Sequence, residues 1–297
     1  MRVLTHTVIE AEAGQPVKQL LLHLWGVSGS FLSRLKFRQA ITVNGAPVTV
    51  RFVPCPGDVL AADISDLPGE HPHIRPVDFP LDILYEDEDL LLINKPAGIA
   101  VHPAALTEET ATIAGAAAHY LHSESFHAVN RLDRGTTGVM AVAKTGFIHA
   151  RCMAMLHTDD FRREYRAVCE GIPSPAEGDI DLPIGRAESS LLKRQADPLG
   201  QQPAHTHYEV LAASQGRALL RLTPTTGRTH QLRVHMAAIG HPLTGDWLYG
   251  TEDRALIARP ALHSYHLRMM HPLTGTTIDV TAPLPEDIQR LLKEERL

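Results

Sequence analysis

Cysteine is scarce in this sequence. The 297 residues include three cysteines, Cys55, Cys152 and Cys169, and no two of them form a CxxC pair. An odd number without paired spacing argues against a disulfide framework and against a cysteine-based zinc site. We therefore expect three ordinary reduced thiols.

Long apolar segments are also lacking. The longest apolar runs, such as residues 19–25, are far shorter than a membrane-spanning helix, and no basic stretch leads into an apolar signal core. These absences predict a cytoplasmic protein without a membrane partner, and we expect a monomer by default. The length and the hydrophobic content of 44% are enough for one large domain and a small one.

Motifs for cofactors and metals are missing as well. The sequence contains no GxGxxG, no GxxxxGK[ST] and no HExxH. His230, His235 and His241 invite a metal hypothesis, but their spacing does not produce the i, i+4 pair of a helical zinc site. We expect an activity that needs no metal, NAD or ATP.

The net charge of −6 is unfavourable for a nucleic-acid partner, but it hides an asymmetry. Residues 57–90 hold ten carboxylates against one arginine, whereas residues 14–53 contain no Asp or Glu. The basic residues of that second stretch are Lys18, Arg34, Lys36, Arg38 and Arg51. A localised basic surface of this kind could bind RNA, with Arg34, Lys36 and Arg38 as candidates; a solvated face without a partner is the alternative.

Residues 1–62 have the pattern of a compact α+β unit. Two helices are expected at 17–25 and 28–39, followed by a hairpin over 40–48 whose turn is Asn44-Gly45. A turn at Pro56-Gly57-Asp58 then leads into a short strand at 59–62. This order resembles the S-four-like RNA-binding module, named after a ribosomal protein of the small subunit. The alternative is a unit that merely packs on the main domain.

Residues 63–80 contain four prolines and scattered charges, so we expect a linker there and a second domain over 81–297. In this domain short β-branched segments alternate with medium helices. Strands are predicted at 90–94, 139–143, 164–169, 206–211, 218–222, 263–269 and 277–281. Helices are predicted at 111–122, 147–157, 229–239 and 285–295. The expected fold class is α+β, with a mixed, largely antiparallel central sheet and flanking helices.

A carboxylate between two arginines is the first candidate for chemistry. In residues 127–139, Asp133 lies between Arg131-Leu132 and Arg134, just before a Thr-Thr-Gly turn that enters an apolar strand. Loops held by rigid elements often carry function, and adjacent cations favour the ionised carboxylate that a nucleophile or base requires. A surface salt-bridge cluster is the competing interpretation, and spacing alone favours it.

A short helix at 229–239 supplies a second candidate. Thr229 is expected to be its N-cap and Gly240 its C′ residue, with Pro242 ending it. Arg233 would then lie one turn into the helix, where a guanidinium can clamp a carboxylate with two parallel hydrogen bonds. Arg233 is therefore the predicted partner of Asp133.

A strand around residues 162–171 contributes an aromatic residue. Its alternation predicts Tyr165, Ala167 and Cys169 on one face, with the arginines on the other. Tyr165 could be a plain core residue or could stack on a base, and the pattern alone leaves both open.

Taken together, these segments closely resemble the RluA family of RNA pseudouridine synthases over roughly residues 82–284. The resemblance includes Asn94-Lys95-Pro96-Ala97-Gly98, His102-Pro103, Arg131-Leu132-Asp133, Tyr165, residues 227–235 and 240–242, and Gly245-Asp246-Trp247-Leu248-Tyr249-Gly250. The S-four-like module is a frequent companion in that family. Asn130 and Gly135 depart from its commonest pattern, which has His and Asp there.

The resemblance implies a role for each matched residue. It makes Asp133 the catalytic aspartate, Arg233 its ion-pair partner and Tyr165 the aromatic that lies against the target base. It makes Arg131 the residue that fills the stack when the uridine flips. Arg134, Arg228 and His230 are expected to contact RNA, and Leu232 and Val234 to pack the helix.

The implied activity is isomerisation of specific uridines in structured ribosomal or transfer RNA. The sequence does not decide whether Asp133 acts on the base or on the ribose. A non-catalytic RNA-binding or ribosome-assembly factor of the same fold is the main alternative, although such a factor would be free to lose Asp133, Tyr165 or Arg233. A metal-dependent hydrolase built on the histidines is a weaker one.

Overall fold

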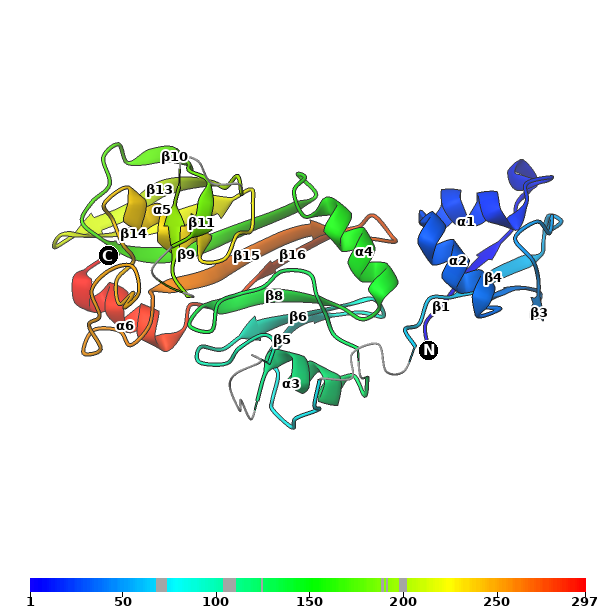
Figure 1. The fold of residues 1–297 in the computed structure, drawn as a ribbon, viewed down its shortest axis with the longest axis horizontal. Coiled ribbons are helices and arrows are strands. Elements are labelled where there is room, and N and C mark those ends of the chain that lie inside the picture. The colour runs from blue at the N-terminus through cyan, green and yellow to red at the C-terminus, as the bar shows by residue number, and fades with distance from the viewer. Residues whose placement is uncertain (68–73, 104–110, 124, 188–189, 191, 198–201) are drawn as a thin grey trace.

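A computed structural model describes residues 1–67, 74–103, 111–123, 125–187, 190, 192–197 and 202–297. The chain forms a small N-terminal unit at one end of the long axis and an elongated body built on a large sheet (Figure 1). In the described residues, no helix is long and apolar enough to cross a membrane. The middle of the expected 63–80 linker and the loop after Pro103 lie outside the described residues.

The N-terminal unit combines two helices with a four-stranded sheet of order β1-β4-β2-β3. Its elements are β1 (Val3–Thr7), a 3-10 turn (Glu10–Glu12), α1 (Val17–Trp25), α2 (Gly29–Phe37), β2 (Ile41–Val43), β3 (Ala46–Pro47) and β4 (Val59–Asp63). The Ser28 hydroxyl accepts a 3.2 Å hydrogen bond from the Phe31 amide and so starts α2. Both predicted helices and the Asn44-Gly45 hairpin are confirmed. The prediction missed β1, because that strand is defined by its pairing with the distant β4.

The body contains a ten-stranded mixed sheet. Its main path is β10 (Glu177–Asp181), β13 (His205–Ser214), β14 (Arg217–Pro224), β9 (Phe161–Glu170), β15 (Leu262–Met270), β8 (Thr137–Ala143), β6 (Leu90–Lys95) and β5 (Ile83–Glu86). Off this path, β16 (Thr277–Thr281) pairs with β15, and β7 (His127–Ala128) pairs with β8. The pair β8–β15 is parallel and the other pairs are antiparallel, which confirms the expected mixed, largely antiparallel sheet.

The parallel pairing of β8 and β15 depends on a glycine. Gly138 has a φ of +105°, and a Cβ atom there would lie 2.1 Å from the Ser264 carbonyl oxygen. A larger residue would therefore be strained and would push the two strands apart. Because Gly138 is near the start of β8, this close approach fixes where the loop that carries Asp133 enters the sheet.

Four helices flank the sheet: α3 (Ile113–Tyr120), α4 (Gly146–Met155), α5 (Gln231–Ala238) and α6 (Glu286–Glu295). Threonine N-caps begin two of them, since Thr112 accepts from the Gly115 amide and Thr145 from the Ile148 amide. A short hairpin of β11 (Ile184–Arg186) and β12 (Arg194–Ala196) lies outside the main sheet. The seven predicted strands and four predicted helices are all present, and all but β16 have shifted ends, whereas β5, β7, β10, β11 and β12 were not predicted.

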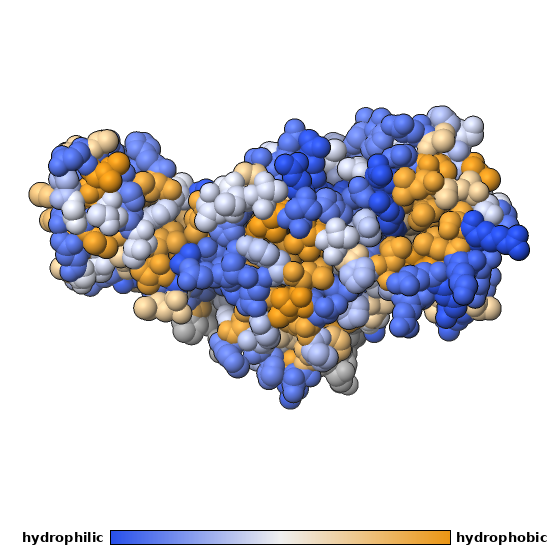
Figure 2. All heavy atoms as spheres, turned by 180° about the vertical axis from the view of Figure 1, so that it is seen from behind, coloured by the Kyte–Doolittle hydropathy of each residue, from blue (hydrophilic) through white to orange (hydrophobic). Residues whose placement is uncertain are grey.

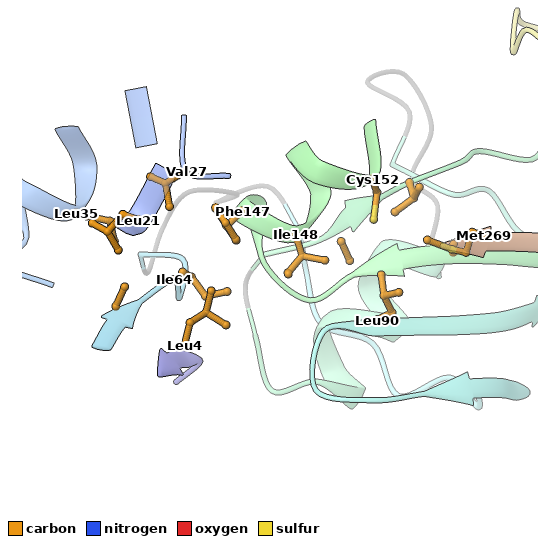
Figure 3. Packing of buried hydrophobic residues seen from close by; sticks show 14 of the residues in the cluster. Leu4, Leu21, Val27, Leu35, Ile64, Leu90, Phe147, Ile148, Cys152 and Met269 are labelled. Atoms are coloured by element: carbon orange, nitrogen blue, oxygen red, sulfur yellow. The ribbon is translucent and has the colours of Figure 1, made fainter. Parts of the chain in front are cut away.

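The N-terminal unit packs firmly against the body. One hydrophobic core contains Leu4, Leu21, Val27, Leu35 and Ile64 of the unit together with Leu90, Phe147, Ile148, Cys152 and Met269 of the body (Figure 3). The rings of Phe31 and Phe147 lie 4.8 Å apart, and the Arg2 guanidinium donates two hydrogen bonds, of 2.8 and 2.9 Å, to the buried Asp89 carboxylate. Seen from behind, the unit is a lobe joined to the body, and apolar side chains lie in several separate patches (Figure 2).

The start of the expected linker is also packed. Ile64 is fully buried, and the Asp66 carboxylate contacts the His127 ring nitrogen at 2.7 Å and accepts a 2.9 Å hydrogen bond from the Gly146 amide. Burial opposes ionisation of Asp66, but the His127 and Gly146 hydrogen bonds outweigh it and lower the pKa of this carboxyl. Residues 64–66 therefore attach the unit to β7 and to the beginning of α4.

Candidate active site

A cavity of about 640 Å³ lies over the middle of the sheet. It is bounded by the loop before β8, the face of β9, residues 224–233 and one side of α4. Among the residues singled out from the sequence, it brings together Asp133, Tyr165, Arg233, Arg131, Arg228 and His230. These residues come from three segments separated by at least 30 positions, so their meeting is a product of the tertiary fold.

Asp133 lies in the loop between β7 and β8, with its side chain 29% exposed. Its carbonyl accepts a 3.0 Å hydrogen bond from the Thr136 amide, which closes a turn just before β8. The neighbouring Leu132 is buried in the core beneath the cavity. The carboxylate is thus held at the cavity wall, where a ligand can reach it.

Lys95 supports this loop from below, a role that the sequence did not reveal. Its side chain is fully buried at the end of β6, and its Nζ donates to the carbonyls of Pro96, Arg134 and Thr136 at 2.9, 3.3 and 3.0 Å. Burial lowers the pKa of Lys95 to about 8, against the pull of the nearby Asp133 carboxylate. The ammonium group therefore binds the backbone on both sides of Gly135 and holds the turn that follows Asp133.

Arg233 contacts two carboxylates at once. Its Nε and Nη2 donate 2.7 Å hydrogen bonds to the two oxygens of Asp246, and its Nη1 lies 3.4 Å from Oδ2 of Asp133. Burial opposes the charge of the guanidinium, but the Asp246 carboxylate outweighs it and raises the pKa of Arg233. Arg233 is therefore fixed by Asp246 and presents its remaining nitrogen to Asp133.

Asp246 itself was not singled out as a site residue. Its side chain is fully buried, and Oδ1 also accepts from the amides of Leu248 and Tyr249 at 3.1 and 3.3 Å. A buried carboxylate of this kind is stable only when its charge is compensated, and here a guanidinium and two amides compensate it. The sequence signal was weak, because Asp246 lies 13 residues after Arg233 and in no regular element.

The helix that carries Arg233 begins later than expected. α5 starts at Gln231, and its N-cap is His230 in the left-handed region at φ 58°, so the prediction of Thr229 as N-cap was wrong. The amide oxygen of Gln231 accepts hydrogen bonds from the Thr226 hydroxyl and the Arg228 amide, and these bonds hold the preceding turn. Gly240, at φ 85°, follows the C-cap Ile239 as predicted.

Tyr249 connects this helix start to the β11–β12 hairpin. Its hydroxyl contacts Nδ1 of His230 at 2.9 Å and accepts a 2.8 Å hydrogen bond from the Arg194 amide, while the Arg233 guanidinium lies 5.0 Å from the ring centroid. Burial lowers the pKa of His230 and raises that of Tyr249, so both are neutral near pH 7. Tyr249 therefore supports the positions of the Arg233 and His230 side chains.

Tyr165 lies on β9 with 6% of its surface exposed and lines the cavity. Burial raises the pKa of its hydroxyl, which keeps the side chain neutral. The predicted separation of Tyr165 from the arginines of this strand is wrong for Arg163. With a strand period of two, Arg163 shares the buried face of Tyr165, and only Arg162 and Arg166 lie on the other.

The two arginines beside Asp133 have different environments. Arg131 is exposed and lines the cavity, whereas Arg134 lies outside the lining and donates a 2.8 Å hydrogen bond from Nε to the Gly98 carbonyl. Arg228 lines the cavity, and its Nε is held at 3.0 Å by the Pro203 carbonyl. Of the three, Arg131 and Arg228 thus line the cavity, whereas Arg134 does not.

The two positions that depart from the usual family pattern have structural contacts. Asn130 is buried, and its Oδ1 accepts a 2.8 Å hydrogen bond from the Ala141 amide of β8, while its Nδ2 has no partner among the residues that the structure describes. Gly135 accepts a 3.0 Å hydrogen bond at its carbonyl from Arg259, and a Cβ there would lie 3.3 Å from Pro260. Asn130 therefore anchors the Asp133 loop to the sheet.

The basic residues of the N-terminal unit lie outside the cavity lining. Lys36 is exposed on α2, beside Phe37, whose side chain is 91% exposed. Arg34 is also exposed, and its guanidinium lies 5.5 Å from the centroid of the Phe31 ring. Arg38 is tied to the exit of the unit by a 2.6 Å hydrogen bond to the Ser65 carbonyl and a 3.6 Å contact with Asp63.

Metal ligands and thiols add no further candidates within the described ranges. There, no group of three or more His, Cys, Asp or Glu side chains is arranged to hold a metal ion. The three cysteines are free, with Cys152 and Cys169 buried. Burial raises the pKa of both buried thiols to about 12, so neither is a thiolate at neutral pH.

Comparisons with known proteins place the chain in a family. The family model described as RNA pseudouridylate synthase matches residues 89–238, which include the Asp133 loop, β9 and α5. The Bacillus subtilis protein named "Uncharacterized RNA pseudouridine synthase YjbO" is 40% identical over 275 residues, covering 91% of this chain and 96% of its own length. Escherichia coli "Ribosomal large subunit pseudouridine synthase D" is 37% identical over 311 residues, covering 99% of this chain and 94% of its own.

A solved structure extends the likeness to three dimensions. "Human RNA Pseudouridylate Synthase Domain Containing 4" superimposes with a TM-score of 0.60 and 26% identity, covering 72% of this chain and 93% of that protein. The fold and the sequence relationships together define an RNA-modifying isomerase. The chain belongs to the RNA pseudouridylate synthase family, in its RluA-type branch, and its activity is that of an RNA pseudouridine synthase.

Proposed function

We propose that this enzyme flips specific uridines out of structured ribosomal RNA and converts them to pseudouridine with Asp133 as its catalytic carboxylate. One observation carries the proposal. Asp133 is the single carboxylate among the described residues that line the cavity, and it lies 3.4 Å from the fixed guanidinium of Arg233. A negative charge held this way is suited to act on a nucleoside bound in the cavity.

Each neighbour has a distinct part in the proposed reaction. The uridine must leave its stack, which costs a few kcal/mol, and the exposed Arg131 can fill the gap with its planar guanidinium. Arg233 keeps the Asp133 carboxylate ionised and holds it in the orientation needed to act on the nucleoside. Tyr165 bounds the base pocket as a neutral phenol and can assist removal of the final proton.

The reaction itself explains why this set of residues suffices. Isomerisation breaks the bond from ribose to the base nitrogen, rotates the base and rejoins it through carbon, so there is no net redox change and no external energy source. Asp133 acts either by adding to the base or by assisting at the anomeric carbon. In both routes the cavity must hold the freed base against Tyr165 while it turns.

The relatives favour ribosomal RNA over transfer RNA as the substrate. The Escherichia coli and Yersinia pestis relatives are both named for the ribosomal large subunit, and each aligns with at least 97% of this chain. An aligned region that includes the N-terminal unit favours a shared mode of substrate selection. A cytoplasmic monomer is the simplest state for such an enzyme.

We assign residues 1–62 as an S-four-like RNA-binding module, 63–80 as its connection and 81–297 as the catalytic domain. The exposed side chains of Arg34, Lys36 and Phe37 on α2 give the module both cations and a ring for stacking. Arg38 instead holds the module's exit strand. The module would contact RNA that extends beyond the cavity.

Two measurements test the proposal. Asp133→Ala should abolish pseudouridine formation on ribosomal RNA while leaving RNA affinity and thermal unfolding close to wild type. Asp159→Ala is the matched control, because that carboxylate is 92% exposed and lies outside the cavity. Normal turnover by Asp133→Ala would contradict the catalytic role. Pseudouridine mapping of cellular RNA with and without the enzyme identifies the substrate, and modified positions confined to transfer RNA would contradict the ribosomal assignment.

A further inference from the structure

A second arginine is buried in the cavity wall without the compensation that Arg233 has. Arg163 lies on β9, two residues before Tyr165 and on the same face, with 6% of its surface exposed. No carboxylate pairs with it anywhere in the part of the chain that the structure describes. A buried charge without a counter-ion is costly, so its presence beside the base pocket requires an explanation.

The hydrogen bonds of Arg163 leave most of its donors unused. Nη2 donates to the Thr226 carbonyl at 3.1 Å, whereas Nε is shielded from solvent and has no acceptor among the described residues. Nη1 lies next to Gly227, where a Cβ atom would come within 3.2 Å of it. Because Gly227 has no side chain, this nitrogen stays uncovered at the cavity wall. The guanidinium is therefore held by Thr226 and lies 5.8 Å from the centroid of the Phe161 ring, while Nη1 has no acceptor among the described residues.

The charge balance of the cavity indicates which ligand would complete this site. In the part of the lining that the structure describes there are four arginines, Arg131, Arg163, Arg228 and Arg233, against the single carboxylate of Asp133. Asp246 already neutralises Arg233 from behind, and Asp133 contacts Arg233 on the cavity side. Arg163 therefore contributes uncompensated positive charge, which suits a phosphate.

We propose that Arg163 binds a non-bridging oxygen of the phosphodiester next to the flipped uridine. Side chains two residues apart on one face of a strand are separated by about 7 Å, so Tyr165 and Arg163 can contact the base and an adjoining phosphate of one nucleotide. Nη1 donates to the phosphate while Thr226 holds Nη2. The contact positions the nucleotide after flipping, and it rests on the base-flipping function proposed above.

Neutral phosphate analogues test this contact directly. Substrate RNA would carry a single uncharged methylphosphonate at the phosphate on the 5′ side or the 3′ side of the target uridine. At the contacted position, the wild-type enzyme should lose about 10- to 100-fold in kcat/KM. Arg163→Gln should show a similar loss with natural RNA and almost no further loss with that analogue. Arg163→Lys should lose less than Arg163→Gln with natural RNA, because it keeps the charge.

Arg162→Gln is the matched control, since Arg162 is on the same strand, faces the other way and pairs with the exposed Asp159. It should behave as wild type with every RNA. If the loss caused by Arg163→Gln and the loss caused by the methylphosphonate multiply at both phosphate positions, the proposal is overturned. Such a result would point instead to recognition of the uracil carbonyls by Arg163. Thermal unfolding checks each variant. If Arg163→Gln does not fold, Arg163→Lys serves with the same analogues: its loss at the contacted phosphate should be smaller than that of the wild type, and an equal loss in the two proteins overturns the proposal.

Failure of this contact is distinguishable from failure of the proposed function. If Asp133 is not catalytic, Asp133→Ala will turn over natural RNA. If Arg163 does not bind phosphate, Asp133→Ala stays inactive, whereas methylphosphonate affects the wild type and Arg163→Gln by the same factor.

Discussion

Arg233 and Asp246 form a buried ion pair joined by two 2.7 Å hydrogen bonds, and this pair, rather than the contact with Asp133, sets the position of the guanidinium. The third nitrogen of Arg233 lies 3.4 Å from Asp133, which is a longer and weaker contact. The side-on pairing with Asp246 thus leaves one donor directed at the loop that carries Asp133. Arg233 is positioned before any substrate binds.

Removing the Asp246 charge should disturb both stability and turnover. In Asp246→Asn, the buried Arg233 keeps, among the described residues, only the weaker 3.4 Å contact with Asp133 as a counter-ion, and we expect the free energy of unfolding to fall by about 3 kcal/mol. Arg233 should also move toward Asp133, which lowers kcat more than it raises KM. Urea unfolding and steady-state kinetics measure the two effects, with Asp159→Asn as an exposed control. An unchanged kcat would show that Asp246 does not position Arg233.

Lys95 should matter for catalysis although it does not line the cavity. In Lys95→Met, the carbonyls of Pro96, Arg134 and Thr136 lose their shared donor, so the turn after Asp133 should shift. A displacement of about 1 Å at the carboxylate lowers kcat by about 100-fold, with little change in RNA affinity. Lys144→Met is the control on the neighbouring segment, where Lys144 pairs with Glu86. Wild-type kcat in Lys95→Met would show that the turn holds without this ammonium group.

The surface of α2 should contribute to RNA affinity without affecting the chemical step. Lys36→Gln should weaken binding and reduce the slope of log affinity against log salt by about 0.7 to 0.9 if it contacts one phosphate. Phe37→Ala should weaken binding by about 1 to 3 kcal/mol if a base stacks on its ring. Lys293→Gln, exposed on α6, is the control. An equal loss of RNA affinity in Lys293→Gln and in Lys36→Gln would show only a general effect of net charge.

Acid should destabilise the enzyme through His263. This histidine is fully buried on β15, contacts the Thr137 hydroxyl at 2.8 Å, and burial lowers its pKa to about 4. The unfolded chain takes up its proton near pH 6.5, so stability is full above that pH and falls as the pH drops toward 4. Between pH 7.5 and pH 5 the loss from this group is about 2 kcal/mol.

Urea unfolding of the wild type and of His263→Gln at those two pH values isolates this contribution. His266→Gln is the control, because His266 lies on the same strand and faces the partly exposed Asp279. The difference between the two pH values should shrink in His263→Gln and persist in His266→Gln. An equal pH dependence in all three proteins would assign the acid sensitivity to other groups.

Much of the architecture was predictable from local patterns. The Asn44-Gly45 turn, the apolar periodicity of α1 and the β-branched segments of β8 and β9 act over a few residues, so they identify elements without tertiary information. Elements stabilised by distant partners were missed. β1 pairs with β4 some 55 residues later, and β10 forms the sheet edge beside β13, so neither has a strong signal of its own.

The sequence by itself determined the family and the sheet class, and it singled out six residues that the fold then brings to one cavity: Asp133, Tyr165, Arg233, Arg131, Arg228 and His230. Predictions from local sequence were wrong at two points of the site: the N-cap of α5, which is His230, and the face of β9 on which Arg163 lies. Only the tertiary structure showed that Asp246 holds Arg233, that Lys95 supports the Asp133 turn and that Arg163 lacks a counter-ion. Burial and pairing decide these properties, and both depend on contacts between residues far apart in the chain.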